Sequence, residues 1–396
     1  MQIAILGGGV AGLSAAIALT LRGHTVQVYE RRAASSTYGA GVTLWPNATF
    51  VIAELGVRDR LHLVSGRPHS MQRLDAAGVP LGVVDIRAIG EQMAHPTLSV
   101  LRRDLQRVLV DRLAELGVVV SYGRSASEVG EHGARAWARF EDGEEIAADV
   151  VLGAEGRMSS AARRYVSPGA TPVYQGFVNW VGIAESSDLL VEDPHVITDF
   201  WGTGSRFGIV PLGATRAYWA GGTAIRLDAI GAPQNLRAEL QARFLEWPAV
   251  VRRIIDASAT ASLRTIAVHD LEPMSCWHRG RVLLIGDAAH ASLPTSGQGA
   301  CQALEDAWHL ARCLRPNDPD PQASFERFTA LRAMKTRHIA LAGRHLASSI
   351  FHTDPDACRS RDQRTREADH HQLAAAMATS WSVGLPLPGS TPARAP

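Results

Sequence analysis

Three glycines near the start of the chain, Gly7, Gly9 and Gly12, have the spacing G-x-G-x-x-G. In this pattern the first glycine makes a tight turn, the second lets the backbone approach a pyrophosphate, and the third lets a helix pack closely on a strand. Glu30 follows 18 positions after Gly12. A carboxylate at about that distance accepts hydrogen bonds from ribose hydroxyls and repels a 2′-phosphate. The pattern therefore predicts a site for the adenosine half of FAD or NAD.

A second group of residues that could do chemistry lies around Asp287, far along the chain. The stretch 281–285 before it is an apolar strand, and Gly297 and Gly299 precede a helix that starts near residue 300. A carboxylate at a strand end suits a polyol hydroxyl, and the N–H groups of a glycine-lined helix start suit an electron-rich ring edge. These groups match the ribityl chain and the ring of FAD. Taken alone, Asp287 and the neighbouring His290 could equally have structural roles.

Alternating strands and helices must position both groups. An apolar strand at 2–6, a helix at 13–21 and a strand at 25–29 surround the first glycines. From 171 to 269, alternating apolar and polar segments predict a mainly antiparallel sheet. Elsewhere, apolar periodicity predicts helices at 46–55, 102–116, 235–244, 300–314 and 320–349, and strands at 118–122, 136–141, 148–153 and 281–285.

Three further residues indicate close contacts with other groups. Arg102 occupies the first position of a predicted helix, where the helix dipole disfavours a cation unless an anion such as a phosphate lies nearby. The alternative is a solvated surface arginine. Gly39 and Gly41 indicate a loop that lies close to another part of the molecule, or else ordinary turn chemistry.

Composition limits the classes of partner. The 396 residues include 40 basic and 39 acidic ones, for a net charge of +1, so we expect no nucleic acid and no anionic membrane as a partner. No apolar run approaches the roughly 18 residues of a membrane span. Because the chain enters a strand at once, we expect no secretory signal and a cytoplasmic protein. The four cysteines have no metal-ligand spacing, which predicts reduced thiols and no metal site.

Four motifs in order carry a family resemblance: GGGVAG with Glu30, then LRRDL, GAEGRMSSAARR and GDAAHASLPTSGQGACQALEDA. Over about residues 1–345 the chain resembles the single-component FAD-dependent aromatic hydroxylases of the para-hydroxybenzoate hydroxylase fold. The resemblance implies an α/β fold, with a Rossmann-like FAD-binding domain, a mainly antiparallel β-sheet substrate domain and C-terminal helices. We expect the FAD-binding domain at 1–75, 98–170 and 270–349, the substrate domain at 76–97 and 171–269, and a C-terminal surface tail at 350–396.

The resemblance also implies the residues that hold FAD. One position departs from the family, because Glu155 stands where the D-G motif has Asp, which puts the affinity for the nicotinamide reductant in question. The implied cofactor-binding residues are Gly7, Gly9, Ala11, Gly12, Glu30, Arg31, Thr43, Arg102, Ala126, Asp287, Pro294, Gly297, Gln298, Gly299, Ala300 and Cys301.

The middle of the chain most resembles bacterial urate hydroxylases and, more loosely, hydroxynicotinate and salicylate hydroxylases. By this resemblance Asn179, Arg206, Tyr218 and Thr295 contact the substrate, and Arg206 and Tyr218 are catalytic. Thr295 stands where the urate branch has an acid that pairs with the arginine, and Thr43 where hydroxynicotinate hydroxylases have a histidine. From the residues alone, Arg206 could stabilise a phenolate or enolate, or it could be an ordinary sheet-surface arginine beside a packed tyrosine.

The resemblance implies an FAD-dependent monooxygenase that uses NADH or NADPH and O2 to hydroxylate a planar, electron-rich aromatic or heteroaromatic molecule through a flavin hydroperoxide. We expect a monomer or a homodimer. The alternatives are an epoxidase or dehydrogenase of the same fold, a plain NAD-dependent dehydrogenase, and a non-catalytic flavin-binding protein. The chain lacks the W-x-W-x-x-P motif of flavin halogenases, which argues against that branch.

Overall fold

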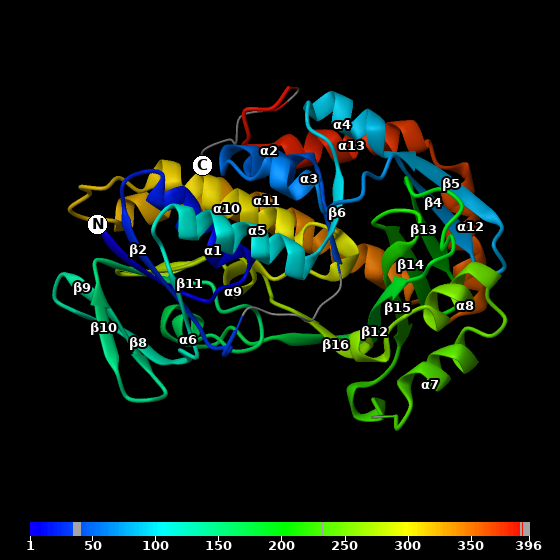
Figure 1. The fold of residues 1–396 in the computed structure, drawn as a ribbon, viewed down its shortest axis with the longest axis horizontal. Coiled ribbons are helices and arrows are strands. Elements are labelled where there is room, and N and C mark those ends of the chain that lie inside the picture. The colour runs from blue at the N-terminus through cyan, green and yellow to red at the C-terminus, as the bar shows by residue number, and fades with distance from the viewer. Residues whose placement is uncertain (35–40, 232, 389, 391–396) are drawn as a thin grey trace.

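The computed structural model describes residues 1–34, 41–231, 233–388 and 390, and its two larger sheets lie at opposite ends of an elongated molecule (Figure 1). The first sheet has six strands in the order β17-β18-β11-β1-β2-β7, and all neighbours are parallel except β17 and β18. Its strands are β1 (Gln2–Leu6), β2 (Thr25–Glu30), β7 (Val120–Tyr122), β11 (Val150–Gly153), β17 (His278–Arg279) and β18 (Val282–Leu284).

Buried helices pack against this parallel sheet. Helix α1 (Val10–Thr20) is apolar on almost all sides and contacts both α5 (Arg102–Glu115) and α10 (Gly299–Cys313). A helix that is apolar all round must be covered all round, and this is why the three helices form a layer on the sheet (Figure 1). The arrangement places the start of α1 and the start of α10 in the same layer.

The second sheet has seven strands in the order β16-β12-β15-β14-β13-β4-β5 and is antiparallel except for β13 and β4. Strand residues alternate between the two faces of a sheet. Trp180, Phe207 and Trp219 point to one face, where they pack with α7 and α8. The strands and helices are β4 (Ser70–Asp75), β5 (Pro80–Asp85), β12 (Val173–Glu185), β13 (Val196–Trp201), β14 (Ser205–Pro211), β15 (Arg216–Ala224), β16 (Arg264–Asp270), α7 (Leu236–Arg243) and α8 (Ala249–Asp256).

Two small sheets and several short helices complete the described chain. Strands β3 (Gly41–Leu44) and β6 (Leu98–Leu101) pair between the two large sheets. The other elements are β8 (Ala126–His132), β9 (Arg135–Phe140), β10 (Glu145–Ala148), α2 (Pro46–Glu54), α3 (Arg58–His62), α4 (Ile86–Met93), α6 (Ala161–Val166), α9 (Asp287–His290), α11 (Gln322–Ile350), and the 3₁₀ turns η1 (Leu227–Ala229), η2 (Thr260–Ser262) and η3 (Pro294–Ser296).

The expectation of a surface tail from residue 350 is wrong. Helices α12 (Pro355–Glu367) and α13 (His370–Ser382) follow α11, and α13 lies against α4 and β5 (Figure 1). Trp381 is buried, and its ring lies 4.6 Å from that of Trp45. The side chains of Asp354 and Asp369 accept hydrogen bonds from the first turns of these helices. These two N-cap aspartates were a sequence signal for α12 and α13, although the polar composition of this stretch had indicated a surface tail.

The predicted fold class is confirmed by this architecture of a mostly parallel sheet with helices and a separate, mainly antiparallel sheet. One boundary of the predicted domain division differs, because β4 pairs with β13 and so lies in the seven-stranded sheet. The rest of the division stays a prediction. No helix within the described residues has both the length and the apolar character to cross a membrane.

Candidate active site

The turn between β1 and α1 shows which glycines the protein itself requires. Gly7 has a φ of +113°, and a Cβ there would overlap the carbonyl oxygen of Ala154. A Cβ at Gly12 would overlap the carbonyl oxygen of Gly7. At Gly9, by contrast, a Cβ would meet no described heavy atom within 4 Å. Packing within the protein therefore explains Gly7 and Gly12 but not Gly9, as expected if a ligand approaches the backbone at Gly9.

Glu30, at the end of β2, is hydrogen-bonded to this turn. Its Oε2 accepts a hydrogen bond of 2.7 Å from the backbone N–H of Gly8, and its Oε1 accepts one of 3.0 Å from the N–H of Arg32. Each carboxylate oxygen has a further lone pair for a ribose hydroxyl. The backbone N–H of Arg124 donates to the Glu30 carbonyl at 2.9 Å, which places Ala126, at the start of β8, near the same strand end.

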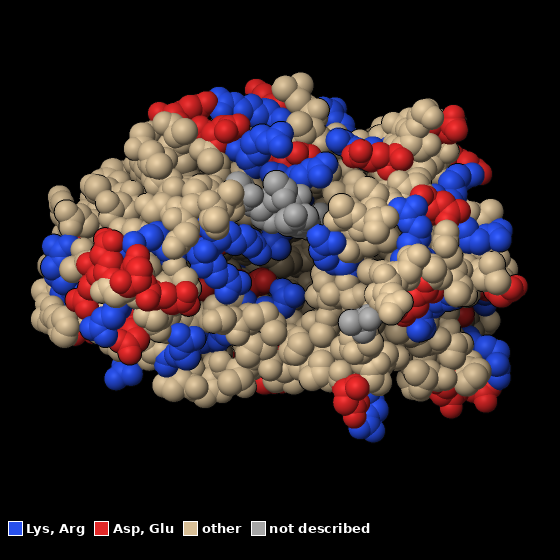
Figure 2. All heavy atoms as spheres, turned by 60° about the horizontal axis from the view of Figure 1, so that its bottom comes forward, with Lys and Arg blue, Asp and Glu red and all other residues tan. Residues whose placement is uncertain are grey.

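Charged side chains gather beside the turn. Arg102, the first residue of α5, lies within electrostatic range of Arg32 and Arg157 and of the carboxylates of Glu30 and Asp287. Three cations against two carboxylates leave one positive charge, which suits the two phosphates of a dinucleotide. Figure 2 shows Lys and Arg side chains around a hollow on one face of the molecule.

Two members of this cluster, Arg32 and Arg157, were not predicted from the sequence. Arg31, which was predicted, is exposed, and its role stays a prediction. Arg157 Nη1 lies 3.3 Å from Asp287 Oδ2. Arg32 belongs to the basic pair Arg31-Arg32 directly after Glu30, which was a signal in the sequence. The role of Arg157 became apparent only from its contact with Asp287 in the structure.

The second predicted motif lies against the first. A Cβ at Gly286 would stand 2.6 Å from the Cβ of Ala11, so the strand end that carries Asp287 touches the start of α1. Gly286 has a buried backbone N–H that donates to Asp306 Oδ2 at 2.8 Å. The structure thereby joins the two glycine motifs into one site, as one long cofactor requires.

The loop before α10 forms the far side of this site. Pro294 and Gly297 are exposed, and the Gly297 carbonyl accepts a hydrogen bond of 3.0 Å from Trp45 Nε1. Helix α10 then begins at Gly299, followed by Ala300, so its first N–H groups have no partner within the helix. Cys301 is buried, which raises the pKa of its thiol to about 12, and the thiol is therefore protonated and unreactive.

Arg206 on β14 is held by a carboxylate of the neighbouring strand. Its Nε donates to Asp199 Oδ1 at 2.6 Å, and Trp201 Nε1 donates to the other oxygen, Oδ2, at 2.8 Å. Thr295 has no such role, because its Oγ1 donates to the Gly343 carbonyl at 2.7 Å. Asp199 is thus the carboxylate that pairs with Arg206 in this chain, and sequence reasoning missed it because the strand register was unknown.

Tyr218 on β15 reaches from the sheet to β3. Its hydroxyl lies 2.9 Å from Thr43 Oγ1, and a Cβ at Gly41 would overlap its ring. The indication that Gly41 lies close to something is therefore confirmed, whereas Gly39 lies outside the described residues. Burial raises the pKa of the Tyr218 hydroxyl well above its ordinary value.

Asn179 on β12 is buried on the same face of the sheet as Arg206, since both pair with Gly222.

The chain matches the protein family described as FAD binding domain over residues 1–316. It belongs to this family. It is 31% identical over 376 residues to the FAD-dependent urate hydroxylase of Klebsiella pneumoniae subsp. pneumoniae, covering 94% of each chain. It is 33% identical to the 3-amino-4-hydroxybenzoate 2-monooxygenase of Streptomyces cremeus, covering 92% of each chain. The structure of Klebsiella pneumoniae HpxO complexed with FAD and uric acid matches with a TM-score of 0.87 and 28% identity, covering 96% of each chain.

Family membership confirms FAD as the cofactor and the resemblance to flavin-dependent aromatic hydroxylases. The residues described above fit this cofactor, since Gly9 offers open backbone, Glu30 a ribose acceptor and Arg102 a cation for phosphate. Within the described parts of the chain, no three or more His, Cys, Asp or Glu residues are grouped so that they could hold a metal ion.

A buried polar cluster lies beside the loop before α10, and His290 belongs to it. His290 Nε2 lies 2.6 Å from Asp306 Oδ2, and Arg332 Nε donates to Asp306 Oδ1 at 2.8 Å. Burial alone would raise the pKa of Asp306, but His290 and Arg332 lower it well below its ordinary value. Because Asp306 also accepts the Gly286 N–H, the cluster positions the strand end before Asp287. These contacts support the structural alternative for His290.

The same cluster connects the loop before α10 to the C-terminal helix α13. Lys335 Nζ lies 2.9 Å from Glu305 Oε2 and donates to the Trp381 carbonyl at 2.6 Å. Asn47 Nδ2 donates to Glu305 Oε1 at 2.7 Å and to Gln298 Oε1 at 2.9 Å. The Gln298 Oε1 is therefore engaged inside the protein, whereas its Nε2 is buried with no hydrogen-bond partner among the described residues, and its contact with the cofactor stays a prediction.

Glu155 serves as a cap for helix α6. Its carboxylate accepts hydrogen bonds of 2.7 Å from the N–H of Ala161, 3.2 Å from that of Ala162 and 2.5 Å from the hydroxyl of Ser160. Burial raises the pKa of Glu155, and these donors oppose the shift. The longer acid in the D-G motif thus fits a local capping role.

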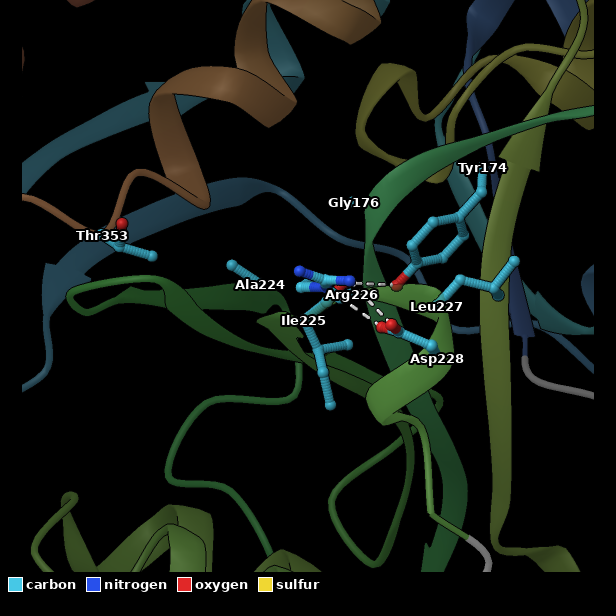
Figure 3. A pocket seen from close by; sticks show the side chains of 8 residues that line it. All are labelled: Tyr174, Gly176, Ala224, Ile225, Arg226, Leu227, Asp228 and Thr353. Carbon is cyan, nitrogen blue, oxygen red and sulfur yellow. Dashed lines mark hydrogen bonds and ion pairs between the residues drawn. The ribbon is translucent and has the colours of Figure 1, made fainter.

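A separate open cavity of about 820 Å³ lies at one end of the seven-stranded sheet, between β12, β15 and the start of α12 (Figure 3). Its cation is already paired, because Arg226 Nη2 lies 2.7 Å from Asp228 Oδ2. The Tyr174 hydroxyl donates to the Ile225 carbonyl at 2.8 Å. With Arg226, Asp228 and Tyr174 already paired, this cavity offers no reactive arrangement comparable to that around Arg206.

Proposed function

We propose that the protein hydroxylates a planar, electron-rich aromatic or heteroaromatic molecule, taking two electrons from NADH or NADPH and one oxygen atom from O2. One observation carries the proposal. The Thr43 hydroxyl lies 2.9 Å from the Tyr218 hydroxyl on the sheet, and the Thr43 carbonyl accepts a hydrogen bond of 3.6 Å from the Cys301 thiol in the first turn of α10. A single residue thus connects the start of α10 to the face of the seven-stranded sheet that carries Arg206, which supports a substrate position between the two.

In the proposed function, the residues on the two sides have complementary tasks. FAD, when bound, supplies the redox chemistry and the activation of O2. The N–H groups at the start of α10 stabilise negative charge on the edge of its ring. Arg206 stabilises the phenolate or enolate form of the substrate, which is the form that an electrophilic oxygen attacks. Tyr218 stays neutral, because burial raises its pKa, and it orients the ring by hydrogen bonding and packing.

The choice between NADH and NADPH, the monomeric or dimeric state and the cytoplasmic location remain predictions from sequence. Among relatives, urate and 3-amino-4-hydroxybenzoate are named as substrates. We propose that this protein acts on a ring of the same general kind, with urate disfavoured because Thr295 replaces the acid of that branch.

A substrate panel scored by product formation tests the proposal. The FAD-loaded protein is given NADH or NADPH, O2 and each of a set of hydroxylated or aminated aromatic rings, and hydrogen peroxide is measured alongside to reveal uncoupling. We expect at least one ring to accelerate nicotinamide oxidation and to yield a hydroxylated product. Arg206→Gln should abolish the product while flavin content stays unchanged, whereas Arg226→Gln, in the separate cavity, should hydroxylate normally. A normally active Arg206→Gln would refute this assignment of the substrate site.

A further inference from the structure

Thr295, in the loop before α10, is hydrogen-bonded to a helix rather than to the substrate sheet. Its Oγ1 donates to the Gly343 carbonyl of α11 at 2.7 Å. Gly343 is buried, and a Cβ there would stand 3.1 Å from the Cβ and 3.4 Å from the backbone nitrogen of Ser296. Glycine is disfavoured inside a helix relative to alanine. The close approach of the loop therefore explains why α11 has a glycine at this position.

The next residue, Arg344, joins the same turn of α11 to the seven-stranded sheet. Its Nε donates to Asp270 Oδ2 at 2.6 Å, and its Nη2 donates to Asp270 Oδ1 at 3.0 Å. Asp270 is fully buried at the end of β16, where it pairs with Val173 of β12, and its Oδ1 also accepts from Gln175 Nε2 at 2.8 Å. An arginine that bonds both oxygens of a carboxylate fixes orientation as well as distance. Gly343 and Arg344 therefore connect the loop and the sheet through one turn of a helix.

The chain just after β16 contacts both the loop and α11. The backbone N–H of Leu271 donates to the Ala291 carbonyl of the loop at 3.2 Å. Arg344 Nη1 donates to Glu272 Oε2 at 2.9 Å, and Arg344 Nη2 donates to the Leu271 carbonyl at 3.3 Å. The loop is thus held at Ala291 and at Thr295, and of these two contacts only that of Thr295 uses a side chain of the loop.

We propose that Thr295 is a positioning residue for FAD, because its bond to Gly343 holds the loop before α10 in the place that receives the flavin ring. This inference rests on the proposed function only in placing the ring beside this loop, and it does not require hydroxylation. A loop that is already ordered loses less conformational freedom when a ligand binds, so the affinity for the ring end of FAD is higher. The adenosine end, at Gly9 and Glu30, should not depend on Thr295.

A comparison of FAD with ADP separates the two ends of the cofactor. The FAD-loaded protein is diluted and the released FAD is measured by its fluorescence, and ADP is then added as a competitor. Thr295→Val keeps the shape of the side chain and removes the hydroxyl. We expect it to bind FAD roughly fivefold more weakly, as for one lost hydrogen bond, and to bind ADP as the native protein does. Thr295→Ser, which keeps the hydroxyl, should retain the native affinity for both.

Gly343→Ala tests the other side of the contact. Its Cβ would press on Ser296, so FAD binding should weaken by a similar factor although alanine favours the helix. Thr379→Val is the matched control, because Thr379 Oγ1 also donates to a helix carbonyl, that of Ala375 at 3.0 Å, at an exposed position of α13. It should leave the affinities for FAD and ADP unchanged.

Three results would overturn the inference: native FAD affinity in Thr295→Val, an equal loss of FAD and ADP affinity in this variant, or an equal loss of FAD affinity in Thr295→Val and Thr295→Ser. Should Thr295→Val not fold, the FAD and ADP affinities of Gly343→Ala decide in the same way. If the native protein hydroxylates no ring, the proposed function fails and this comparison still stands. Native FAD affinity in Thr295→Val would instead refute the inference and leave the proposed function intact.

Discussion

The hydroxyl groups of Thr43 and Tyr218 lie 2.9 Å apart, although 175 residues separate them in the chain. Thr43 belongs to β3, between the two large sheets, and Tyr218 belongs to the seven-stranded sheet. The contact joins β3 to the face of the seven-stranded sheet that we propose binds the substrate. Small changes in this hydrogen bond should therefore alter substrate orientation more than cofactor binding.

Tyr218→Phe removes this hydrogen bond and keeps the ring. We expect kcat/KM for hydroxylation to fall roughly tenfold, the value of a single lost hydrogen bond, with unchanged flavin content. Because burial raises the pKa of Tyr218, the residue is neutral, and the pH profile should keep its shape between about pH 7 and pH 9. Tyr174→Phe, in the separate cavity of Figure 3, is the control and should have native kinetics. A variant with a changed pH profile would indicate that the hydroxyl ionises in the reaction.

Gly9→Ala and Gly12→Ala separate cofactor binding from folding. Gly9 has φ −82° and ψ −173°, which alanine adopts freely, and among the described residues no heavy atom outside its own neighbours and helix lies within 4 Å of its Cβ. We expect Gly9→Ala to keep its secondary structure and to bind FAD at least roughly tenfold more weakly. Gly12→Ala should instead lose folded protein, since its Cβ would overlap the backbone of Gly7. Circular dichroism and flavin titration measure the two effects, and native FAD affinity in Gly9→Ala would contradict the phosphate role of this turn.

Arg332→Met tests the buried cluster. Arg332 is fully buried between Glu305, at 2.5 Å, and Asp306, at 2.8 Å. Removing the cation leaves buried carboxylates without compensation, so the free energy of unfolding should fall by about 3–5 kcal/mol. Urea denaturation measures this loss. Arg337→Met, at an exposed position of the same helix, should change stability by less than about 0.5 kcal/mol, and equal stability of the two variants would show that the cluster contributes little.

Acid should destabilise the protein through His309. Burial lowers the pKa of His309 to about 3, with a further contribution from Arg332. The unfolded chain binds this proton below about pH 6.5, so the stability present above that pH is lost as the pH falls toward about 3. At pH 5 this loss amounts to roughly 2 kcal/mol.

His309→Leu should remove that part of the acid sensitivity, as measured by thermal unfolding at pH 7 and pH 5. His345→Gln, at an exposed position of α11, should lose as much stability at pH 5 as the native protein. If His309→Leu is as acid-sensitive as the native chain, the histidine is not held neutral.

Local spacing made the first half of the site predictable. The positions of Gly7, Gly9 and Gly12 follow from turn geometry, and the start of α5 at Arg102 follows from apolar periodicity. The partner of Arg206 could not be predicted, because Asp199 comes close only through the pairing of β13 with β14. Such a register depends on contacts along whole strands rather than on neighbouring residues.

The C-terminal helices were missed for a related reason. Helix α12 is strongly polar, and its burial depends on partners far away in sequence, such as the Gly202 carbonyl that accepts from Arg361 Nη1 at 3.2 Å. Periodicity measures only the apolar face of a helix. The N-cap residues Asp354 and Asp369 were local signals, but they mark only where helices begin and not whether they pack.

The most direct test of the central claim is the origin of the oxygen atom in the product. The FAD-loaded protein is supplied with NADH or NADPH, oxygen-18 gas and the ring that best stimulates nicotinamide oxidation, and the product is examined by mass spectrometry. A flavin monooxygenase transfers one oxygen atom from O2 to the ring, so the account predicts a product with one heavy oxygen atom. A product whose new oxygen comes from water, or nicotinamide oxidation that yields hydrogen peroxide alone with every ring tested, would contradict it.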